Sequence, residues 1–330
     1  MKHELLEELV FNIQSDKDFE VAALAVFQFQ SLHNEVYKKY INILGIKPEN
    51  VKTINEIPFL PIDFFKKYEV MCGKYVPEQV FTSSGTSSTI NSRHFIKKTD
   101  IYIRSFLAGF QKFYGSEKDY TFICLLPSYL ERNGSSLIYM MNYLVSTSHN
   151  PQSGFYKNID NNFIELLKSL QLNSAHKVIL LGVSFALLDF AEQHKINLSN
   201  FIIMETGGMK GRRKELIRAE LHQILKNKFH VQSIHSEYGM TEMLSQAYSK
   251  KDGIFFTPNH LKVLIRDMND PFTLLKEGQS GVINIIDLAN IYSCSFIATQ
   301  DAGRMVTPHS FEVLGRTDNS DIRGCNLMVL

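Results

Sequence analysis

Short apolar runs alternate with amphipathic segments through the middle of the chain, between residues 120 and 235. Each apolar run has the length of a buried strand, and these runs lie at 120–126, 177–181, 201–204 and 231–235. The segments between them have helical spacing and lie at 134–147, 160–172, 185–194 and 213–228. Strands that alternate with helices predict an α/β fold with a mainly parallel, doubly wound sheet.

The segments on either side of this region follow other patterns. Residues 4–44 have the apolar spacing of two helices, and 80–81 with 93–96 predict two strands joined by a loop. A helix is expected over 99–114. After Gly253 short strands follow one another with turns between them, at 254–257, 261–265, 282–287, 304–306 and 311–314. This last pattern predicts a small antiparallel β lobe.

Composition limits the class of protein. The chain has 330 residues, of which 44% are hydrophobic and 21% charged, as in a soluble globular enzyme with a large core. The net charge of +1 gives no reason to expect a nucleic-acid partner. The four cysteines, Cys72, Cys124, Cys294 and Cys325, lack metal-ligand or Cys-x-x-Cys spacing.

The chain shows no signal for a membrane. Its start is acidic and amphipathic, unlike a signal peptide, and its most apolar run, 178–190, is shorter than a membrane span. We therefore expect no membrane span and a cytoplasmic location. The sequence leaves the oligomeric state open, a homo-oligomer included.

A run of small hydroxyl residues separates the two strands at 80–81 and 93–96. Ser83, Ser84, Gly85, Thr86 and Ser87 form its centre. Small side chains let backbone N–H groups approach a phosphate closely, and glycine tolerates a positive φ. The run lacks the Gly-Lys-Ser/Thr ending of a Walker loop, so a kinase-like or GTPase-like site is not predicted. The plain alternative is an ordinary solvated turn.

Polar residues also follow three of the predicted strands, where ligands of such sheets bind. They are Ser184, the turn Thr206-Gly207-Gly208, and the stretch Ser236–Glu242. In that stretch Tyr238 offers a ring face, Thr241 a hydroxyl for a phosphate, and Glu242 an oxygen ligand for Mg²⁺. The alternative is that Tyr238 is a half-buried core residue and Glu242 a solvated one.

The order of these motifs along the chain resembles the adenylate-forming superfamily. The hydroxyl loop, the Gly-Gly turn and Tyr238-Gly239-Met240-Thr241-Glu242 are followed by 299–304 and 315–318. More narrowly, the chain resembles the acyl-protein synthetase of bacterial bioluminescence (the long-chain-fatty-acid–luciferin-component ligase) and its phenylacetate–CoA ligase relatives. Residues 57–66 are similar to the N-terminal signature of that narrower family, and the resemblance runs from about residue 57 to the end.

This resemblance implies a role for each matching residue. Ser83 to Ser87 would hold the β- and γ-phosphates of ATP. Gly207 and Gly208 would flank the adenine, with Tyr238 stacked on it and Gly239 and Met240 beside it. Thr241 would contact the α-phosphate and Glu242 would bind Mg²⁺. Asp301 would bind the ribose hydroxyls, Arg316 the ribose or a phosphate, and Asp318 would mark a hinge.

The resemblance also implies a reaction. A carboxylic acid, fatty or aryl, would react with ATP to give an acyl-AMP, and the acyl group would pass to a thiol of a protein or carrier. Cys325 matches the acyl-accepting cysteine near the C-terminus of the acyl-protein synthetase; a buried structural cysteine is the alternative. The acyl pocket is expected from 129–144 and 182–190, which include Met140 and Met141.

The chain departs from the superfamily in two places. The hydroxyl loop continues as Ser88 to Arg93 in place of Gly and Pro-Lys, so Arg93 or Lys97 would have to supply the cation. The sequence ends at Leu330, so we expect the mobile C-terminal domain to be absent or vestigial. The expected parts are then 1–250, with the ATP and acyl sites, 251–315, the β lobe, and 316–330, the hinge and tail.

Two other functions fit parts of the sequence. Gly182-Val-Ser184-Phe-Ala186 follows a predicted strand and is close to the nucleophile elbow of an α/β-hydrolase, for which Asp287 and His309 would complete a triad. The hydrolase hypothesis gives no role to the stretch from Tyr238 to Glu242. Alternatively, the chain is a module that binds nucleotide or acyl groups without turnover.

Overall fold

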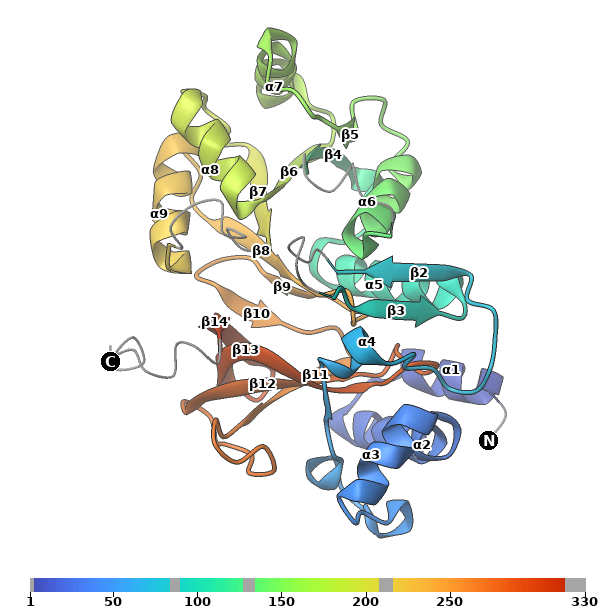
Figure 1. The fold of residues 1–330 in the computed structure, drawn as a ribbon. Helices are drawn as coiled ribbons and strands as arrows, with labels where there is room; N and C mark the ends of the chain where they lie inside the picture. The colour runs from blue at the N-terminus through green and yellow to red at the C-terminus, as the bar shows by residue number, and fades with distance from the viewer. Residues whose placement is uncertain (1–2, 84–89, 127–133, 208–215, 318–330) are drawn as a thin grey trace. The chain divides into compact units, whose positions relative to one another are not determined.

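The computed structural model describes residues 3–83, 90–126, 134–207 and 216–317 (Figure 1). The chain folds into two compact units. One unit combines residues 1–76 with 259–330, and the other is continuous from 77 to 258. This grouping joins the N-terminal helices to the strands after residue 259. The parts expected from the sequence instead placed these helices in 1–250, together with the α/β sheet.

The unit of residues 77–258 contains the predicted parallel sheet. Its strand order is β10-β9-β8-β7-β6-β4-β5, in which β5, β4, β6, β7 and β8 run parallel and β9 and β10 are antiparallel. The strands are β4 (Tyr120–Leu125), β5 (Gly154–Phe155), β6 (Lys177–Val183), β7 (Phe201–Thr206), β8 (Ile234–Tyr238), β9 (Ala247–Ser249) and β10 (Ile254–Phe256).

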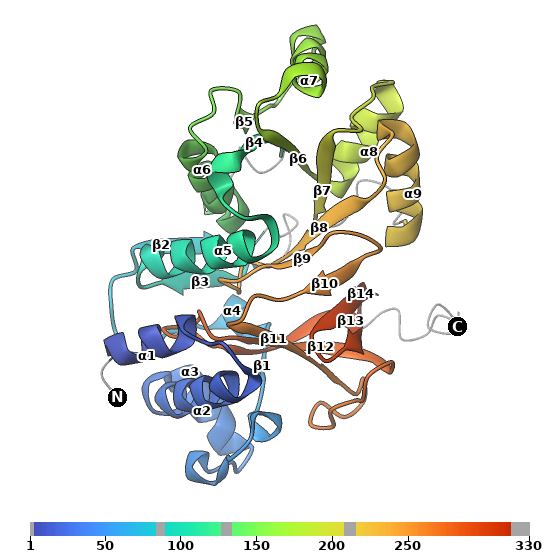
Figure 2. The same cartoon turned by 180° about the vertical axis from the view of Figure 1, so that it is seen from behind.

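Helices cover both faces of this sheet, which is the doubly wound arrangement that the sequence predicts. Figures 1 and 2 show α8 (Ser184–Gln193) and α9 (Arg218–Phe229) side by side on one face, and α5 (Thr99–Tyr114) and α6 (Ser136–Thr147) on the other. A further helix, α7 (Asn161–Asn173), precedes β6. Because the sheet is covered on both faces, all six residues of β4 are buried, as its continuous apolar sequence requires.

Side-chain caps define several helix starts in this unit. Ser135 caps α6 by accepting a hydrogen bond from the Ile138 amide, and Asp160 caps α7 by accepting one from Phe163. A separate two-stranded sheet, β2 (Gln79–Thr82) and β3 (Arg93–Ile96), is the predicted antiparallel hairpin. The hydroxyl-rich run connects these two strands.

The other unit joins helices from the N-terminus to an antiparallel sheet from the C-terminal part. Its strand order is β11-β12-β13-β14, with the short β1 parallel to β13. Its elements are α1 (His3–Phe11), α2 (Asp16–His33), α3 (Glu35–Ile43), β1 (Leu60–Pro61), α4 (Phe64–Lys67), β11 (Leu261–Arg266), β12 (Ser280–Asp287), β13 (Phe296–Thr307) and β14 (Ser310–Arg316), with short 3₁₀ turns at Pro48–Asn50 and Ile54–Glu56.

Buried amides hold these helices to the sheet. Gln30 Nε2 donates to the carbonyl of Asn290 at 2.8 Å, and Asn34 Nδ2 donates to that of Ser293 at 2.9 Å. Both amides are fully buried. Residues separated by about four fifths of the chain therefore share one core.

The structure corrects three of the expected elements. Residues 4–44 form three helices rather than two, because Asn34 ends α2 and its side chain caps α3 by accepting from the Tyr37 amide. Strand β8 begins at Ile234 and includes 236–238, which were expected after it. Strand β13 starts at Phe296 and contains 299–303, well before the expected 304–306. Both strands contain polar residues that interrupt the apolar pattern, so the sequence did not indicate their full length.

Candidate functional site

The hydroxyl-rich hairpin and the loop after β8 meet in the structure. His94 of β3 is buried, and its Nδ1 lies 2.8 Å from the backbone oxygen of Thr241, to which it donates. Ser83 closes the base of the hairpin, because its amide donates to the Ser92 carbonyl and its hydroxyl accepts from the Ser92 amide. Two motifs that lie far apart in the sequence are thus joined directly.

The loop after β8 is a tight turn over the expected contact residues. The amide of Met243 donates to the carbonyl of Met240 at 3.1 Å. Met240 and Thr241 are half-buried and Glu242 is buried. Gly239 is exposed, yet a Cβ there would come within 2.7 Å of Glu237 Oε1, so a side chain at this position would require the Glu237 carboxyl to move.

The carboxyl ends of β7 and β8 lie next to each other, as parallel strands require. Thr206 pairs with Glu237 in register, and Gly207 follows with a φ of +67°, a value that favours glycine. Tyr238, the last residue of β8, is 9% exposed and packs edge-on against Phe255 with ring centroids 5.8 Å apart. Its expected adenine contact therefore involves only a small exposed part of the residue.

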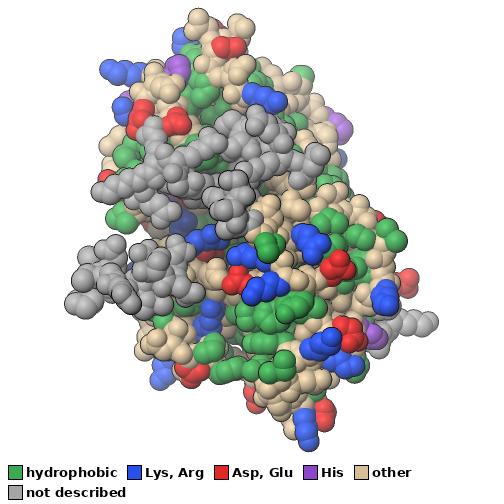
Figure 3. Space-filling view, in the orientation of Figure 1, with side chains coloured by type: hydrophobic (Ala, Val, Ile, Leu, Met, Phe, Trp, Pro, Cys, Tyr) green, Lys and Arg blue, Asp and Glu red, His purple; other side chains and the backbone are tan. Residues whose placement is uncertain are grey.

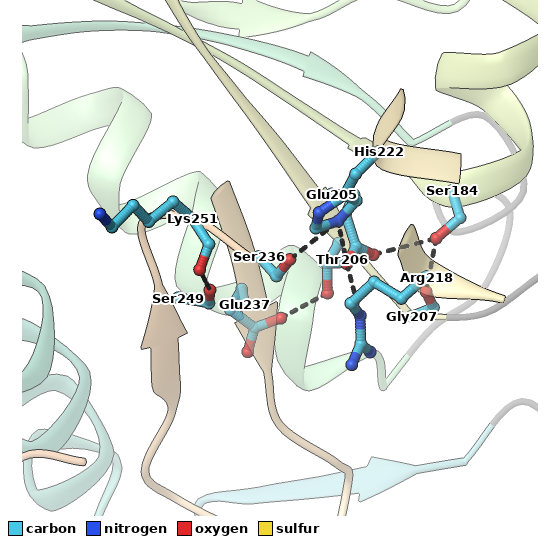
Figure 4. Close-up of polar contacts among 10 residues, drawn as sticks. All are labelled: Ser184, Glu205, Thr206, Gly207, Arg218, His222, Ser236, Glu237, Ser249 and Lys251. Atoms are coloured by element: carbon cyan, nitrogen blue, oxygen red, sulfur yellow. Dashed lines mark hydrogen bonds and ion pairs between the residues drawn. The ribbon is translucent and has the colours of Figure 1, made fainter. Parts of the chain in front are cut away.

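Glu237 is a buried carboxyl that the sequence analysis did not single out. Its Oε2 accepts a hydrogen bond from the Thr206 hydroxyl (Figure 4). Burial raises the pKa of Glu237 to about 7; the Thr206 hydrogen bond opposes this rise and the nearby Glu205 adds to it. This carboxyl therefore titrates near neutral pH.

Glu205 lies at the centre of a second group of buried polar contacts (Figure 4). Its Oε1 accepts from Arg218 Nε at 3.2 Å and lies 3.5 Å from His222 Nε2, and its Oε2 accepts from the Ser184 hydroxyl at 3.0 Å. Burial, the largest influence, raises the pKa of Glu205, but the His222 hydrogen bond, the Arg218 charge and the Ser236 hydroxyl together bring it below its ordinary value. Glu205 is therefore ionised and holds Arg218, His222 and Ser184 around its carboxylate.

The contacts of Ser184 do not match those of a hydrolytic nucleophile. Its hydroxyl also lies 2.7 Å from the Gly207 carbonyl, so its proton is directed to Gly207 or Glu205. A triad needs a histidine that accepts this proton. His222 instead contacts Glu205, and His309 lies 3.8 Å from Asp16. The Ser184 hydroxyl therefore bridges the Glu205 carboxylate and the carbonyl of Gly207.

Asp301 and Arg316 lie together in the unit of residues 1–76 and 259–330. They pair in register on β13 and β14, and Arg316 Nε is 3.5 Å from Asp301 Oδ1. Arg316 is largely exposed and Asp301 largely buried. A carboxylate and a guanidinium are suited to hydroxyl donors and phosphates, respectively.

Other expected site residues lie outside the described residues. They are Ser84, Gly85, Thr86, Ser87, Gly208 and Cys325. Their assigned roles stay predictions.

Surface charge and helix hydropathy agree with the composition. On the described part of the face drawn in Figure 3, Lys and Arg side chains lie among Asp and Glu side chains, in keeping with the net charge of +1. Over the described residues, every helix is too short or too polar to cross a lipid bilayer.

Solved structures with a similar fold are adenylate-forming ligases. An open conformation of 2-hydroxyisobutyryl-CoA ligase in complex with 2-HIB-AMP and CoA matches with a TM-score of 0.64 and 12% identity, over 94% of this chain and 77% of that one. ATP-bound MatB from Rhodopseudomonas palustris matches with a TM-score of 0.55 and 14% identity, over 74% of this chain and 49% of that one. The alignment with the first solved structures thus spans about half of their length. The fold is that of the N-terminal domain of adenylate-forming enzymes.

The family model of acyl-protein synthetase, LuxE, matches residues 9–330. The chain therefore belongs to the acyl-protein synthetase LuxE family, as the motif order predicts. No curated protein matches the sequence.

Proposed function

We propose that this protein activates a carboxylic acid with ATP and then transfers the acyl group to a thiol. A carboxylate oxygen attacks the α-phosphorus, the bond from that phosphorus to the β-phosphate oxygen breaks, and acyl-AMP and pyrophosphate form. A thiolate then attacks the acyl carbon and AMP leaves. A free carboxylate is a poor electrophile, and the first step provides it with a leaving group.

The observation that carries the proposal is the contact between His94 and Thr241. It holds the hydroxyl-rich hairpin against the loop of Thr241 and Glu242. Hydroxyls and backbone amides from one side, and a hydroxyl and a carboxylate from the other, are the groups expected around a nucleoside triphosphate. Membership of the acyl-protein synthetase family supports the same reaction.

Glu242 would be the protein ligand of Mg²⁺. Within the described residues there is no cluster of three or more His, Cys, Asp or Glu side chains that could hold a metal. Mg²⁺ bound with ATP commonly takes only one or two carboxylates, with phosphates and waters as its other ligands, so a single buried Glu242 fits. The ion would neutralise charge on the phosphates.

The other expected residues complete the proposed ATP site. Ser83 to Ser87 would hold the terminal phosphates, Gly207, Gly208 and Tyr238 the adenine with Gly239 and Met240 beside it, and Thr241 the α-phosphate. Asp301 would bind the ribose hydroxyls, and Arg316 the ribose or a phosphate. Cys325 would be the acyl acceptor, or would pass the group to a protein or carrier thiol.

Exchange of radioactive pyrophosphate into ATP tests the first step with a panel of carboxylic acids. We expect exchange that depends on the acid and falls about 100-fold or more in Glu242→Ala. Glu220→Ala, an exposed change on α9, is the control and should exchange like the wild type. Exchange that is unchanged in Glu242→Ala would overturn the metal assignment.

A further inference from the structure

We infer that Asp63 is a positioning residue for ATP binding, which holds the carboxylate of Asp301 in place through a hydrogen bond to the side chain of Gln300. The inference rests on the proposed function, in which Asp301 binds the ribose hydroxyls. It assigns a role to residues 57–66, a segment that resembles a family signature but has no part in the proposed ATP site.

This segment runs parallel to the start of β13, in the unit that joins the N-terminal helices to the strands after residue 259. Its strand β1 pairs with the first residues of β13, and the amide of Ile62 then donates to the Ala298 carbonyl at 3.0 Å. Asp63 follows Ile62 in the chain, and Gln300 lies two residues beyond Ala298. The same parallel register, continued, places Asp63 opposite Gln300.

Both oxygens of the Asp63 carboxylate accept hydrogen bonds. Gln300 Nε2 donates to Oδ2 at 2.7 Å, and Lys66 Nζ donates to Oδ1 at 2.7 Å. Aspartate directly before a helix commonly accepts from backbone amides of the first turn. Asp63 precedes α4, yet within the described residues its side chain makes no capping hydrogen bond to that helix. Its carboxylate instead connects the segment to the strand that carries Asp301.

Gln300 also holds the residue that follows β14. Its carbonyl accepts from the amide of Thr317 at 2.8 Å and from the Thr317 hydroxyl at 2.9 Å. Thr317 directly follows Arg316, which pairs in register with Asp301. Gln300 therefore connects Asp63 to the neighbours of both Asp301 and Arg316.

A bulge in β13 explains why this position depends on side-chain contacts. Between Ala298 and Ala302, the three residues 299–301 of β13 lie opposite the single residue Ile283 of β12. Residues in a bulge lack part of the regular hydrogen-bond ladder, and bulges next to active sites re-aim side chains. The contacts of the bulge with the neighbouring segments therefore set the direction of Asp301.

The side chain of Asp301 reaches the surface only in part. It is 14% exposed, and the guanidinium of Arg316, whose side chain is 75% exposed, lies 3.5 Å from its Oδ1. One carboxylate that accepts from two ribose hydroxyls has to hold its position within about 0.5 Å. Asp63 supplies this restraint through Gln300, so it acts on the position of a nucleotide ligand rather than on the nucleotide.

Calorimetric titration of the full chain with the Mg²⁺ complexes of ATP and 2′,3′-dideoxy-ATP provides the test, because the second nucleotide lacks both ribose hydroxyls. The wild type should bind ATP more tightly by about tenfold or more. Asp63→Ala should reduce this preference to about threefold or less, by weakening ATP binding. Asp63→Asn keeps an oxygen that accepts from Gln300 and should retain the preference. Asp270→Ala, an exposed change in the same unit, is the control and should bind both nucleotides like the wild type.

A second variant tests the connection itself. Gln300→Met removes the donor to Asp63 but keeps the length of the side chain and the backbone carbonyl that Thr317 contacts. The preference for ATP should fall as in Asp63→Ala. The double variant should fall no further, since both changes break one connection. Losses that add in the double variant would show that the two residues act separately, and would overturn the inference.

Each other result has a definite meaning. A preference for ATP that persists in Asp63→Ala or in Gln300→Met overturns the inference. Equal weakening of both nucleotides in these variants indicates a role in folding alone and overturns it as well, as does equal binding of both nucleotides by the wild type. The proposed function is judged separately: if the binding ratios are as expected but pyrophosphate exchange is absent with every acid, the proposed function is overturned and the role of Asp63 stands. Either single variant decides the question if the other fails to fold.

Discussion

At the scale of single residues, Glu205 has the largest predicted effect on stability. It is buried and ionised, and Arg218, His222 and Ser184 all contact its two oxygens. Glu205→Ala would remove the carboxylate that Arg218 and His222 contact, while Ser184 could still donate to the Gly207 carbonyl, and should lower the free energy of unfolding by about 3–5 kcal/mol. Urea unfolding measures this loss. The exposed Glu220→Ala should change the same quantity by less than about 0.5 kcal/mol, and similar losses in both variants would contradict the role of Glu205.

Glu237 predicts how stability depends on pH. Its pKa is raised to about 7 in the folded protein, so between the ordinary value of 4.5 and about 7 the folded state binds more protons than the unfolded state. Stability due to this group is therefore lost as the pH rises through that range. The free energy of unfolding of the wild type, minus that of Glu237→Gln, should decrease from pH 4.5 to 7 and then level off. A difference that is constant with pH would show that Glu237 is ionised throughout.

At the scale of elements, the contact between β3 and the loop after β8 predicts an effect on nucleotide binding. His94→Phe keeps a ring in the core but removes the donor to the Thr241 carbonyl. We expect the KM for ATP to rise about tenfold while kcat changes less, since the loop is misplaced but its side chains remain. Steady-state kinetics measure both. His176→Phe, at an exposed position, is the control, and equal KM values in wild type and His94→Phe would refute the role of this contact.

The elements that the sequence predicted well are those with uninterrupted apolar periodicity. Strands β4, β6 and β7, and helices α6 to α8, lie within a few residues of their predicted bounds. The polar strand residues were missed: Ser236 and Glu237 in β8 look like a loop because their burial depends on partners in other elements. The same holds for Glu205, which ends an apolar run and is kept ionised by Arg218 and His222. One indication of these buried polar residues was present in the sequence: each lies at the end of an apolar run.

The candidate site was only partly predictable for the same reason. The motif order correctly identified the family, and the hairpin of β2 and β3 was expected from the strands on either side of the loop. Its bond to Thr241, and the pairing of Thr206 with Glu237, depend on tertiary register that no local pattern encodes. The triad of Ser184, Asp287 and His309 followed from a local motif, but Ser184 lies next to an acid rather than a histidine.

At the scale of the whole molecule, the two units have different chain connectivity. Residues 77–258 are continuous, whereas the other unit needs residues 1–76 to complete the core of 259–330, through Gln30 and Asn34 for example. A chain of residues 77–258 alone should unfold cooperatively in urea. Residues 259–330 alone should lack a cooperative transition and regain one when 1–76 is supplied. Cooperative unfolding of 259–330 alone would contradict this account of its core.

The reaction itself is tested most directly with an acid labelled with ¹⁸O in its carboxylate, MgATP and hydroxylamine as the acyl acceptor. Adenylation joins a carboxylate oxygen to the α-phosphorus, and attack of hydroxylamine on the acyl carbon leaves that oxygen on AMP. Mass spectrometry should therefore find one ¹⁸O atom in each AMP released. Unlabelled AMP, or ADP with the label in inorganic phosphate, would contradict acyl-AMP formation.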